Sequence, residues 1–425
     1  MSQSRYALPA KAGNPACWSG GPRLRGNDIV SHQSTPASII SPSRRGACPT
    51  LDKPMQTGDG LLARIRVERR TLTPVQLAAL SQLAITHGNG LLEISARGNL
   101  QARGLRPETA PHFARAVTDL VPLETGLVVD TSPLAGNDPL EKADTRPLVA
   151  AICHGALPLQ DKLGPKVSVV VDGGGQIALT AIKADVRLLA LDATHWAVHL
   201  GGGKPQVMDA EAAVSATLAL LAALAALGPA ARANDLFPKA SVAMACPSPA
   251  NGPGWGAAML KTRSGHARPI TLPFSQMHGS ALIALADAAE AAGVATLRLA
   301  PAHRLLLDNA PDSLVESALS LGFITDPADA RLRASACIGS EGCASGHIAA
   351  RSIAGRLSAM IPANQHLHVS GCAKGCAHPQ PSDITLVGRE DGIGLVIKGR
   401  AGDTPQHILD EAGLVPALAA RQDAR

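Results

Sequence analysis

The sequence contains few aromatic residues and little excess charge. Phe, Trp and Tyr together make up 2% of the 425 residues, whereas 46% of the residues are hydrophobic. Any core must therefore be built from Ala, Leu, Val and Ile, and the chain is long enough for several domains. The formal charge of +5 arises within residues 1–54, which carry seven basic and two acidic side chains, while the rest of the chain has 32 of each sign. We therefore expect no nucleic-acid partner.

Features of secreted and membrane proteins are also missing. Eight cysteines in a chain of this length do not make a disulfide scaffold, and no basic segment followed by an apolar one opens the sequence. Residues 212–231 are uncharged and mostly alanine, but Gly228-Pro229 ends the run as at a helix C-terminus. We predict a buried amphipathic helix there rather than a membrane span, and a protein of the reducing cytoplasm without a membrane partner.

The remaining sequence contains a long internal repeat. Segment Leu91–Leu105 aligns with Thr296–Ala310 at an offset of 205 residues, and the helical segments before them align at the same offset. Each copy has the pattern strand, helix, strand, turn, strand, which predicts a pseudo-symmetric pair with one site between the copies. A chance match of apolar periods is the alternative. The matched positions are Leu77, Leu80, Leu92, Ile94 and Leu100 with Leu282, Leu285, Leu297, Leu299 and Leu305.

The predicted fold class is α+β, with two pseudo-symmetric ferredoxin-like half-domains plus two α/β lobes. Residues 1–54 are rich in Ser, Pro, Arg and Gly, which is typical of a disordered tail or an untranslated extension. The predicted half-domains span residues 55–122 and 251–325, and the lobes span 123–250 and 326–425. Further strands are predicted at Leu61–Glu68, Val167–Asp172, Gln176–Ala181, Trp196–Leu200, Leu367–Ser370, Asp383–Val387 and Gly394–Lys398, and a helix at about 347–360.

Four cysteines fall in two glycine-rich stretches. "SACIGSEGCASG" contains Cys337 and Cys343, and "VSGCAKGCAHP" contains Cys372 and Cys376. Zinc usually requires C-x2-C spacing or nearby His partners, and structural thiols or a redox disulfide fit two glycine-flanked loops poorly. Four thiolates on loops that allow close backbone approach fit an iron–sulfur cluster best. The other four cysteines are interpreted as structural or incidental: Cys17, Cys48, Cys153 and Cys246.

The spacing C-x5-C, followed about 30 residues later by C-x3-C, resembles the [4Fe–4S] motif of the sulfite and nitrite reductase superfamily, as do the duplicated half-domain and its "ARGNLQARG" stretch. Within that superfamily, "TSPLAGNDP", "LGPKVSVVVDGGG" and "VSGCAKGCAHP" resemble the precorrin-3B synthase family most. The resemblance covers about residues 58–400. It implies the sulfite/nitrite reductase fold and an oxygen-dependent monooxygenase of aerobic cobalamin biosynthesis. It also implies precorrin-3A and O2 as substrates, a hydroxylated lactone as product, and a [4Fe–4S] cluster with a mononuclear non-haem iron as cofactors.

Alternating arginines occur on two predicted strands of the first repeat. "ARIRVERR" places Arg64 and Arg66 on one face, and "RGNLQARG" places Arg97, Asn99, Gln101 and Arg103 on one face. Periodicity alone fits an ordinary half-exposed sheet. However, the second copy has Ala302, Arg304, Leu306 and Asp308 at the matching positions, so only one copy carries groups suited to the carboxylates of a tetrapyrrole. By the resemblance, the macrocycle is bound by Arg66, Arg97, Gln101, Arg103 and Lys166, with Arg64 and Asn99 as weaker companions.

The sequence also departs from the sirohaem-dependent reductases. Ser168 stands where they have a second lysine, and "LETGLVVD" lacks an arginine expected before the "TSP" loop. Loss of positive charge argues against six-electron reduction of sulfite or nitrite. A sirohaem sulfite or nitrite reductase, with Cys376 bridging cluster and haem, remains the alternative. A non-catalytic electron-transfer or tetrapyrrole-binding protein is a further alternative.

The ligands of a second iron and the electron source are not evident in the sequence. No two-His, one-carboxylate set is found, and each of His195, His199, His366, His368 and His378 is by itself an ordinary polar residue. "NGPGWG" lacks the order of a nicotinamide-binding loop. We therefore expect a separate NADH-linked reductase or ferredoxin as the electron donor.

Overall fold

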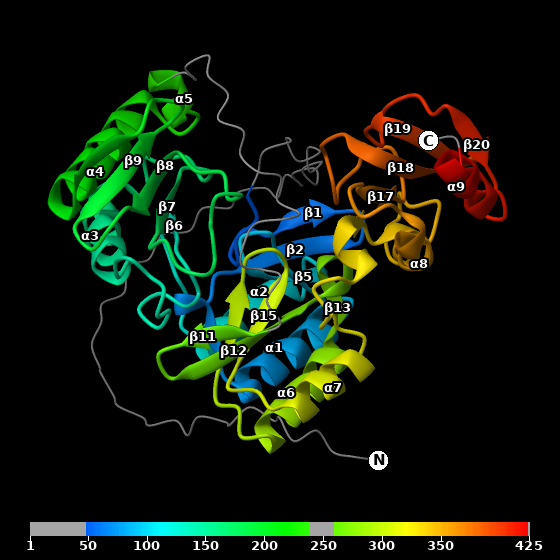
Figure 1. Cartoon of the computed structure of the whole chain (residues 1–425), viewed down its shortest axis with the longest axis horizontal. Coiled ribbons are helices and arrows are strands. Elements are labelled where there is room, and N and C mark those ends of the chain that lie inside the picture. The colour runs from blue at the N-terminus through cyan, green and yellow to red at the C-terminus, as the bar shows by residue number, and fades with distance from the viewer. Residues whose placement is uncertain (1–47, 238–258, 424–425) are drawn as a thin grey trace, which may run out of the picture. The chain divides into compact units, whose positions relative to one another are not determined.

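A computed structural model describes residues 48–237 and 259–423 of the chain (Figure 1). The described residues form four five-stranded sheets. The predictions for residues 1–47, for Cys17 and Cys246, and for the "NGPGWG" stretch lie outside the described residues. Residues 48–54 lead into the first strand, and Leu51 among them is buried.

The first half-domain carries its helices on one sheet. Helix α1 begins at Pro74 because Thr73 forms a capping box with Gln76 and proline is favoured in the first turn. The sheet has the strand order β1-β2-β5-β4-β13. Its elements are β1 (Met55–Thr57), β2 (Gly60–Ile65), α1 (Pro74–His87), β4 (Leu91–Ile94), β5 (Leu100–Leu105), α2 (Ala110–Leu120) and, from the other copy, β13 (Gln276–His278).

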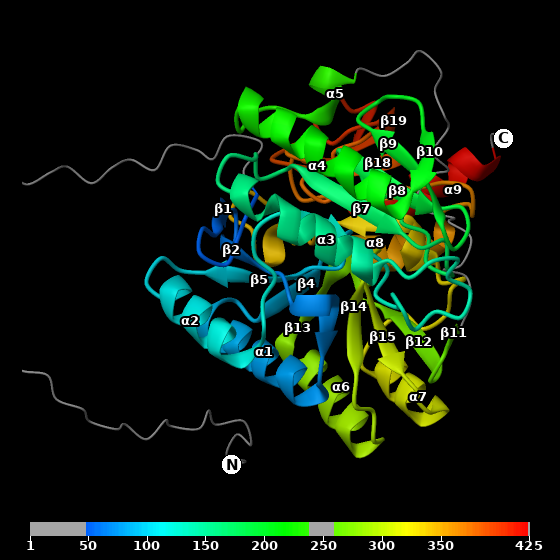
Figure 2. The same cartoon turned by 90° about the vertical axis from the view of Figure 1, so that its left-hand side faces the viewer.

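The second half-domain repeats this arrangement and returns a strand to the first. Its sheet has the order β11-β12-β15-β14-β3. The two half-domains thus exchange their edge strands. Helices α1 and α6 lie side by side on one side of the two sheets (Figures 1 and 2). The elements are β11 (Leu260–Thr262), β12 (Gly265–Thr271), α6 (Gly279–Ala291), β14 (Leu297–Ala300), β15 (Arg304–Asp308), α7 (Asp312–Ser320) and, from the first copy, β3 (Thr71–Leu72).

The strand registers reproduce the sequence repeat. Arg64 pairs with Gln101 in the first sheet, and Pro269 pairs with Leu306 in the second, each 205 positions further on. The exchanged strands keep the same offset. They pair Gln276 with Glu93 in the first sheet and Thr71 with Arg298 in the second. The predicted internal repeat is therefore confirmed, down to the pairing of single residues.

The two α/β lobes also share one topology. In each lobe three parallel strands are followed by two antiparallel ones, in the orders β6-β7-β8-β9-β10 and β16-β17-β18-β19-β20. The first lobe contains β6 (Val128–Asp130), α3 (Arg146–Ala156), β7 (Ser168–Asp172), β8 (Val186–Ala190), β9 (His195–Leu200), β10 (Gln206–Asp209), α4 (Ala210–Leu227) and α5 (Ala233–Leu236). The second contains β16 (Ala334–Ala336), α8 (Ala350–Leu357), β17 (Leu367–Ser370), β18 (Ser382–Arg389), β19 (Gly392–Gly399), β20 (His407–Leu409) and α9 (Leu414–Asp423).

Helix α4 is part of the first lobe's core. Among the described residues it is the one helix long and apolar enough to cross a membrane by length and composition. Its residues Leu220, Leu221 and Leu224 are buried in a cluster with Trp196 of β9 and Ile152 of α3. The predicted helix is present, and this packing agrees with the expectation of a buried amphipathic helix.

One predicted strand is wrong. Residues 176–181 form an irregular segment, and the third parallel strand of the lobe is β8. Carboxylates take the place of a strand ladder there: Asp138 accepts a hydrogen bond from the backbone N–H of Gln176, and Asp172 accepts one from Leu179. The other predicted strands are present, within a few residues at their ends, and the α+β fold class is confirmed. The four sheets fall in the four predicted segments apart from the exchanged strands, but the predicted domain boundaries stay a prediction.

Candidate functional site

The two cysteine stretches meet because they follow adjacent parallel strands. Cys337 comes directly after β16, and Cys372 comes two residues after β17, so both lie at the carboxyl edge of that sheet. The loops touch through their glycines. A Cβ atom on Gly371 would lie 2.9 Å from the Cα atom of Gly339 and 3.3 Å from that of Gly346. These glycines therefore permit a backbone contact that no other residue type allows.

The thiols of these loops form one group. The backbone N–H of Gly371 donates a 3.0 Å hydrogen bond to the Sγ atom of Cys337. Burial raises the pKa of the Cys376 thiol, and the neighbouring thiols of Cys337, Cys372 and Cys343 raise it further. Every cysteine of the described residues is free of disulfide bonds. Four free thiols with an inward-pointing amide are a donor set that fits an iron–sulfur cluster.

Within residues 48–237 and 259–423, no three His, Cys, Asp or Glu side chains are arranged to hold one metal ion. This finding concerns single ions. In a [4Fe–4S] cluster each thiolate binds a different iron, so the ligands lie further apart than those of one ion. The assignment of Cys337, Cys343, Cys372 and Cys376 to a cluster is taken up as a proposal below.

A turn of the first half-domain borders the cysteine site. The carbonyl of Gly58, between β1 and β2, accepts a 2.9 Å hydrogen bond from the backbone N–H of Ala344. The next residue, Asp59, accepts two hydrogen bonds from Arg103, at 2.9 and 2.8 Å, and Arg103 also donates one of 3.0 Å to Glu93. Arg103 is therefore held by two carboxylates next to the cysteine loops. Burial lowers the pKa of Arg103, but the hydrogen bonds and charges of Asp59 and Glu93 outweigh burial and raise it.

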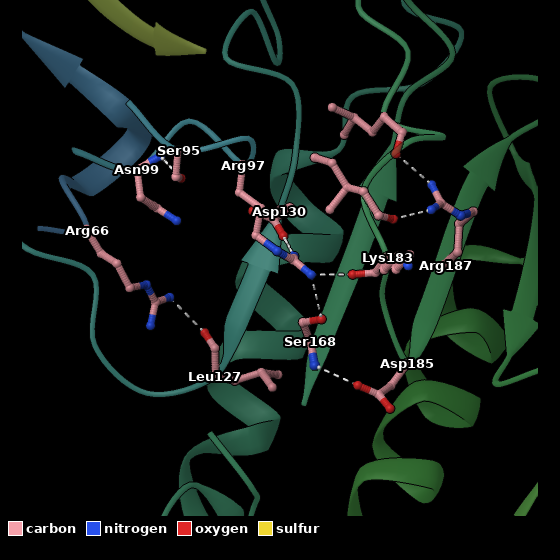
Figure 3. Close-up of polar contacts among 12 residues, drawn as sticks. Arg66, Ser95, Arg97, Asn99, Leu127, Asp130, Ser168, Lys183, Asp185 and Arg187 are labelled. Atoms are coloured by element: carbon pink, nitrogen blue, oxygen red, sulfur yellow. Dashed lines mark hydrogen bonds and ion pairs between the residues drawn. The ribbon is translucent and has the colours of Figure 1, made fainter. Parts of the chain in front are cut away.

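Arg97 and Arg66 also have protein partners in this structure (Figure 3). Arg97 and Arg70 both form ion pairs with the buried carboxylate of Asp130, and Arg97 donates to the carbonyl of Lys183 as well. Arg66 donates to the carbonyls of Gly126 and Leu127, at 2.8 and 3.0 Å. Arg66, Arg97 and Arg103 of the predicted arginine row are thus each held by carboxylates or carbonyls of the protein.

The other predicted substrate residues differ in exposure. Asn99 and Gln101 are buried, and Lys166 is exposed in the turn before β7. Arg97 and Asn99 lie in the turn before β5 rather than on a common strand with Gln101 and Arg103. Gly98 occupies this turn with φ of +80°, which is why the strand starts later than predicted. Ser168, in the place of the expected lysine, is buried and lies 3.5 Å from Arg97.

Three histidines lie together beside the second cysteine loop. The ring centroid of His378 is 4.5 Å from that of His366 and 5.6 Å from that of His368. His368 is fully buried, and neither of its ring nitrogens has a hydrogen-bond partner in the described part of the chain. Burial, together with the neighbouring histidines, lowers the pKa of His366 to about 4 and that of His368 to about 3. Buried ring nitrogens without a partner are costly, so this cluster requires an explanation.

Other predicted histidines have different surroundings, and some site residues were missed. His195 and His199 lie on β9 in the first lobe, and His195 pairs with Asp192 at the surface. Sequence reasoning did not identify Asp59, Glu93 or Asp130, the carboxylates that hold the arginines. Glu93 was detectable, because it lies opposite the arginine-bearing strand in the repeat. Asp130 and Asp59 gave no signal beyond a single acidic residue near a strand end.

Known proteins resemble this chain in both fold and sequence. Residues 53–120 match the nitrite/sulfite reductase ferredoxin-like half domain. The structure of the NirA protein of Mycobacterium tuberculosis superimposes with a TM-score of 0.59 at 20% identity, over 83% of this chain and 78% of that one. A ferredoxin–nitrite reductase of Synechococcus elongatus is 24% identical over 420 residues, which is 80% of each chain. The fold is that of the sulfite and nitrite reductases.

A further relative defines the family more narrowly. A precorrin-3B synthase of Sinorhizobium sp. is 38% identical over 416 residues, which cover 90% of this chain and 89% of that protein. The chain belongs to the precorrin-3B synthase family. The resemblance predicted from the cysteine motif and the repeat is therefore confirmed, and the relatives of this chain are enzymes.

Proposed function

We propose that the chain is a monooxygenase that hydroxylates precorrin-3A with O2 and forms a lactone, ahead of ring contraction in aerobic cobalamin biosynthesis. Membership of the precorrin-3B synthase family supports this function. The observation that carries it is the pair of cysteine loops, which bring four free thiols together next to the turn that Asp59 and Arg103 hold. We also propose that the enzyme is cytoplasmic and receives electrons from a separate NADH-linked reductase or ferredoxin.

In this proposal Cys337, Cys343, Cys372 and Cys376 hold a [4Fe–4S] cluster. The cluster and a mononuclear iron supply electron transfer and oxygen activation when they are bound. The chain itself fixes the cysteine loops through the glycine contacts and holds the sulfur of Cys337 with the amide of Gly371. Hydrogen bonds to the sulfur atoms tune such a cluster.

The macrocycle would be bound by Arg66, Arg97, Gln101, Arg103 and Lys166, with Arg64 and Asn99 beside them. The arginines already have partners within the protein. A carboxylate of the substrate would therefore take the place of a protein carboxylate or carbonyl at the arginine that it binds. Lys166 is exposed, and the buried Nε atom of Arg64 has no partner in the described residues, so each keeps a donor that a ligand carboxylate could use. Positioning of the ring next to the metal would provide much of the catalysis.

The mononuclear iron is proposed to bind at His366, His368 and His378. Neutral imidazole is a common iron ligand, and the buried nitrogens of His368 without partners fit that role. In the described residues these side chains are not arranged to hold one ion, so binding requires the rings to turn about their side-chain torsions. In His368→Ala, iron analysis should show one iron fewer per chain while the EPR signal of the reduced cluster persists. Unchanged iron content would exclude His368 as a ligand.

Turnover with labelled oxygen tests the function directly. Purified, reconstituted protein is incubated with precorrin-3A, a reductant and isotopically labelled O2, and the product mass is measured. The proposal predicts that the product gains labelled oxygen and that no product forms without O2. Sirohaem in the purified protein together with sulfite or nitrite reduction would instead support the reductase. Binding of the tetrapyrrole without turnover would support a carrier.

A further inference from the structure

The turn between β1 and β2 differs from its symmetry-related copy where it touches a cysteine. At the offset of 205 residues, Thr57-Gly58-Asp59-Gly60 corresponds to Thr262-Arg263-Ser264-Gly265 between β11 and β12. Both turns contact a lobe through one backbone hydrogen bond. Ala344 donates to the carbonyl of Gly58 at 2.9 Å, and Arg263 donates to that of Asn137 at 2.7 Å. The loop of Ala344 contains Cys343, whereas the loop of Asn137 has no cysteine.

Gly58 is shaped to the thiol of Cys343. A Cβ atom at position 58 would lie 2.2 Å from the Sγ atom of Cys343, which is far inside van der Waals contact. The φ angle of Gly58 is not in the positive region, so its backbone would accept alanine. The absence of a side chain at this position is therefore required by the sulfur atom and not by the turn.

Asp59 and Arg103 fix this turn. Asp59 accepts hydrogen bonds from the Nε and Nη2 atoms of Arg103 and from the hydroxyl of Thr57. The second copy keeps only part of this arrangement. Its ion pair between Arg298 and Asp308 corresponds to that between Glu93 and Arg103, with the charges reversed. The turn of the second copy adds no carboxylate to this pair, because Ser264 stands at the position of Asp59. The added carboxylate occurs only in the copy that borders the cysteines.

We propose that Gly58, Asp59 and Arg103 are positioning residues for Cys343 and form the wall of the cluster site that comes from the first half-domain. This inference rests on the proposed cluster at the four cysteines. It gives Arg103 a role in holding the cluster loop, in addition to or instead of the binding of a macrocycle carboxylate. Partners of this kind around metal ligands orient the ligands and adjust the properties of the metal.

Two variants test the proposal on reconstituted protein. Asp59→Asn removes the charge that holds Arg103, and Gly58→Ala places a methyl group against the Sγ atom of Cys343. In both we expect iron to be lost to a chelator ~10-fold faster or more, with an altered EPR signal of the reduced cluster. The matched variants Ser264→Ala and Arg263→Ala, in the second copy, should behave as the wild type does. Thermal unfolding of each variant before reconstitution shows whether the fold is kept.

The outcomes separate the inference from the function on which it rests. If the wild type takes up no cluster, the proposed cofactor is wrong. If the wild type takes up a cluster while Gly58→Ala and Asp59→Asn keep their iron and give an unchanged EPR signal, the positioning role is wrong. If the variants of both copies lose iron equally, the effect is one of general stability and the inference is overturned as well.

Discussion

At the scale of single residues, buried carboxylates hold the basic groups of this protein. Asp130 is 1% exposed and forms ion pairs with Arg70, which is buried, and with Arg97. Removal of one member of such a group leaves charges in a poorly solvated place without compensation. Sequence reasoning found Arg97 through its alternation but missed Arg70 and Asp130, because partners 33 and 60 positions apart in the chain leave no periodic signal.

Asp130→Asn should lower the free energy of unfolding by about 3 kcal/mol, since Arg70 then stays buried without its counter-charge. Urea denaturation monitored by circular dichroism measures this change. Asp391→Asn is the matched control, because its ion pair with Arg389 is exposed and contributes at most about 1 kcal/mol. Equal effects of the two substitutions would contradict the structural role given to Asp130.

Glu141 makes stability depend on pH. Burial raises its pKa from 4.5 to about 7, opposed by a hydrogen bond from the N–H of Gly136 and reinforced by Asp138 and Asp144. Between these two pH values the folded chain keeps a proton that the unfolded chain has lost, so the free energy of unfolding falls as the pH rises. We expect Glu141→Gln to be more stable than the wild type at pH 8, by on the order of 1 kcal/mol since solvent screens a half-buried group, and to match it at pH 4. Urea titrations at the two pH values decide this, and equal differences at both would refute it.

At the scale of elements, the exchanged strands connect the two half-domains. Strand β3 has two residues and β13 has three, yet each completes the sheet of the other copy. Segments this short show no periodicity, which is why the sequence predicted the repeat but not the exchange. The strand predicted at residues 176–181 was wrong for another reason: its apolar residues Ile177 and Leu179 are buried, but carboxylates bind its backbone.

Leu72→Ala tests the exchange. Leu72 is 1% exposed on β3 and pairs with Leu297 of the second half-domain. We expect a loss of about 3 kcal/mol in the free energy of unfolding, with one cooperative transition, because both copies depend on this strand. Leu140→Ala, at a position that is 61% exposed, should change it by less than about 0.5 kcal/mol. A separate transition for each half-domain would argue against their coupling.

At the scale of the whole molecule, both copies have the same parts, and only one carries the cysteines. Cys337 directly follows β16, where Thr131 directly follows β6 in the other lobe, and Gly371 follows β17 as Gly173 follows β7. Arg66, Arg97 and Arg103 follow the opposite pattern, since the first half-domain has them and the matching positions of the second hold Thr271, Ala302 and Asp308. We therefore expect the duplicated chain to have a single site, as the sequence indicated through the mismatch of Arg97, Gln101 and Arg103 with Ala302, Leu306 and Asp308.

Because the copies exchange strands, neither half of the chain should fold alone. Residues 48–237 and 238–425, produced separately, should be insoluble or lack cooperative unfolding, since each lacks an edge strand and the contact between the turns near Gly98 and Ala300. Produced together with a tag on one piece, they should copurify. Cooperative unfolding of either piece by itself would contradict the exchange as a folding requirement.

The central claim, a cluster on four thiolates in an enzyme that is not a sirohaem reductase, is tested most directly by the visible spectrum of anaerobically purified protein before and after dithionite. The predicted result is a broad brown absorption that bleaches on reduction, without chlorin-like red bands. The same absorption should be absent from Cys376→Ala. Sharp sirohaem bands would place the chain with the reductases. A protein that stays colourless after reconstitution with iron and sulfide would contradict the cluster itself.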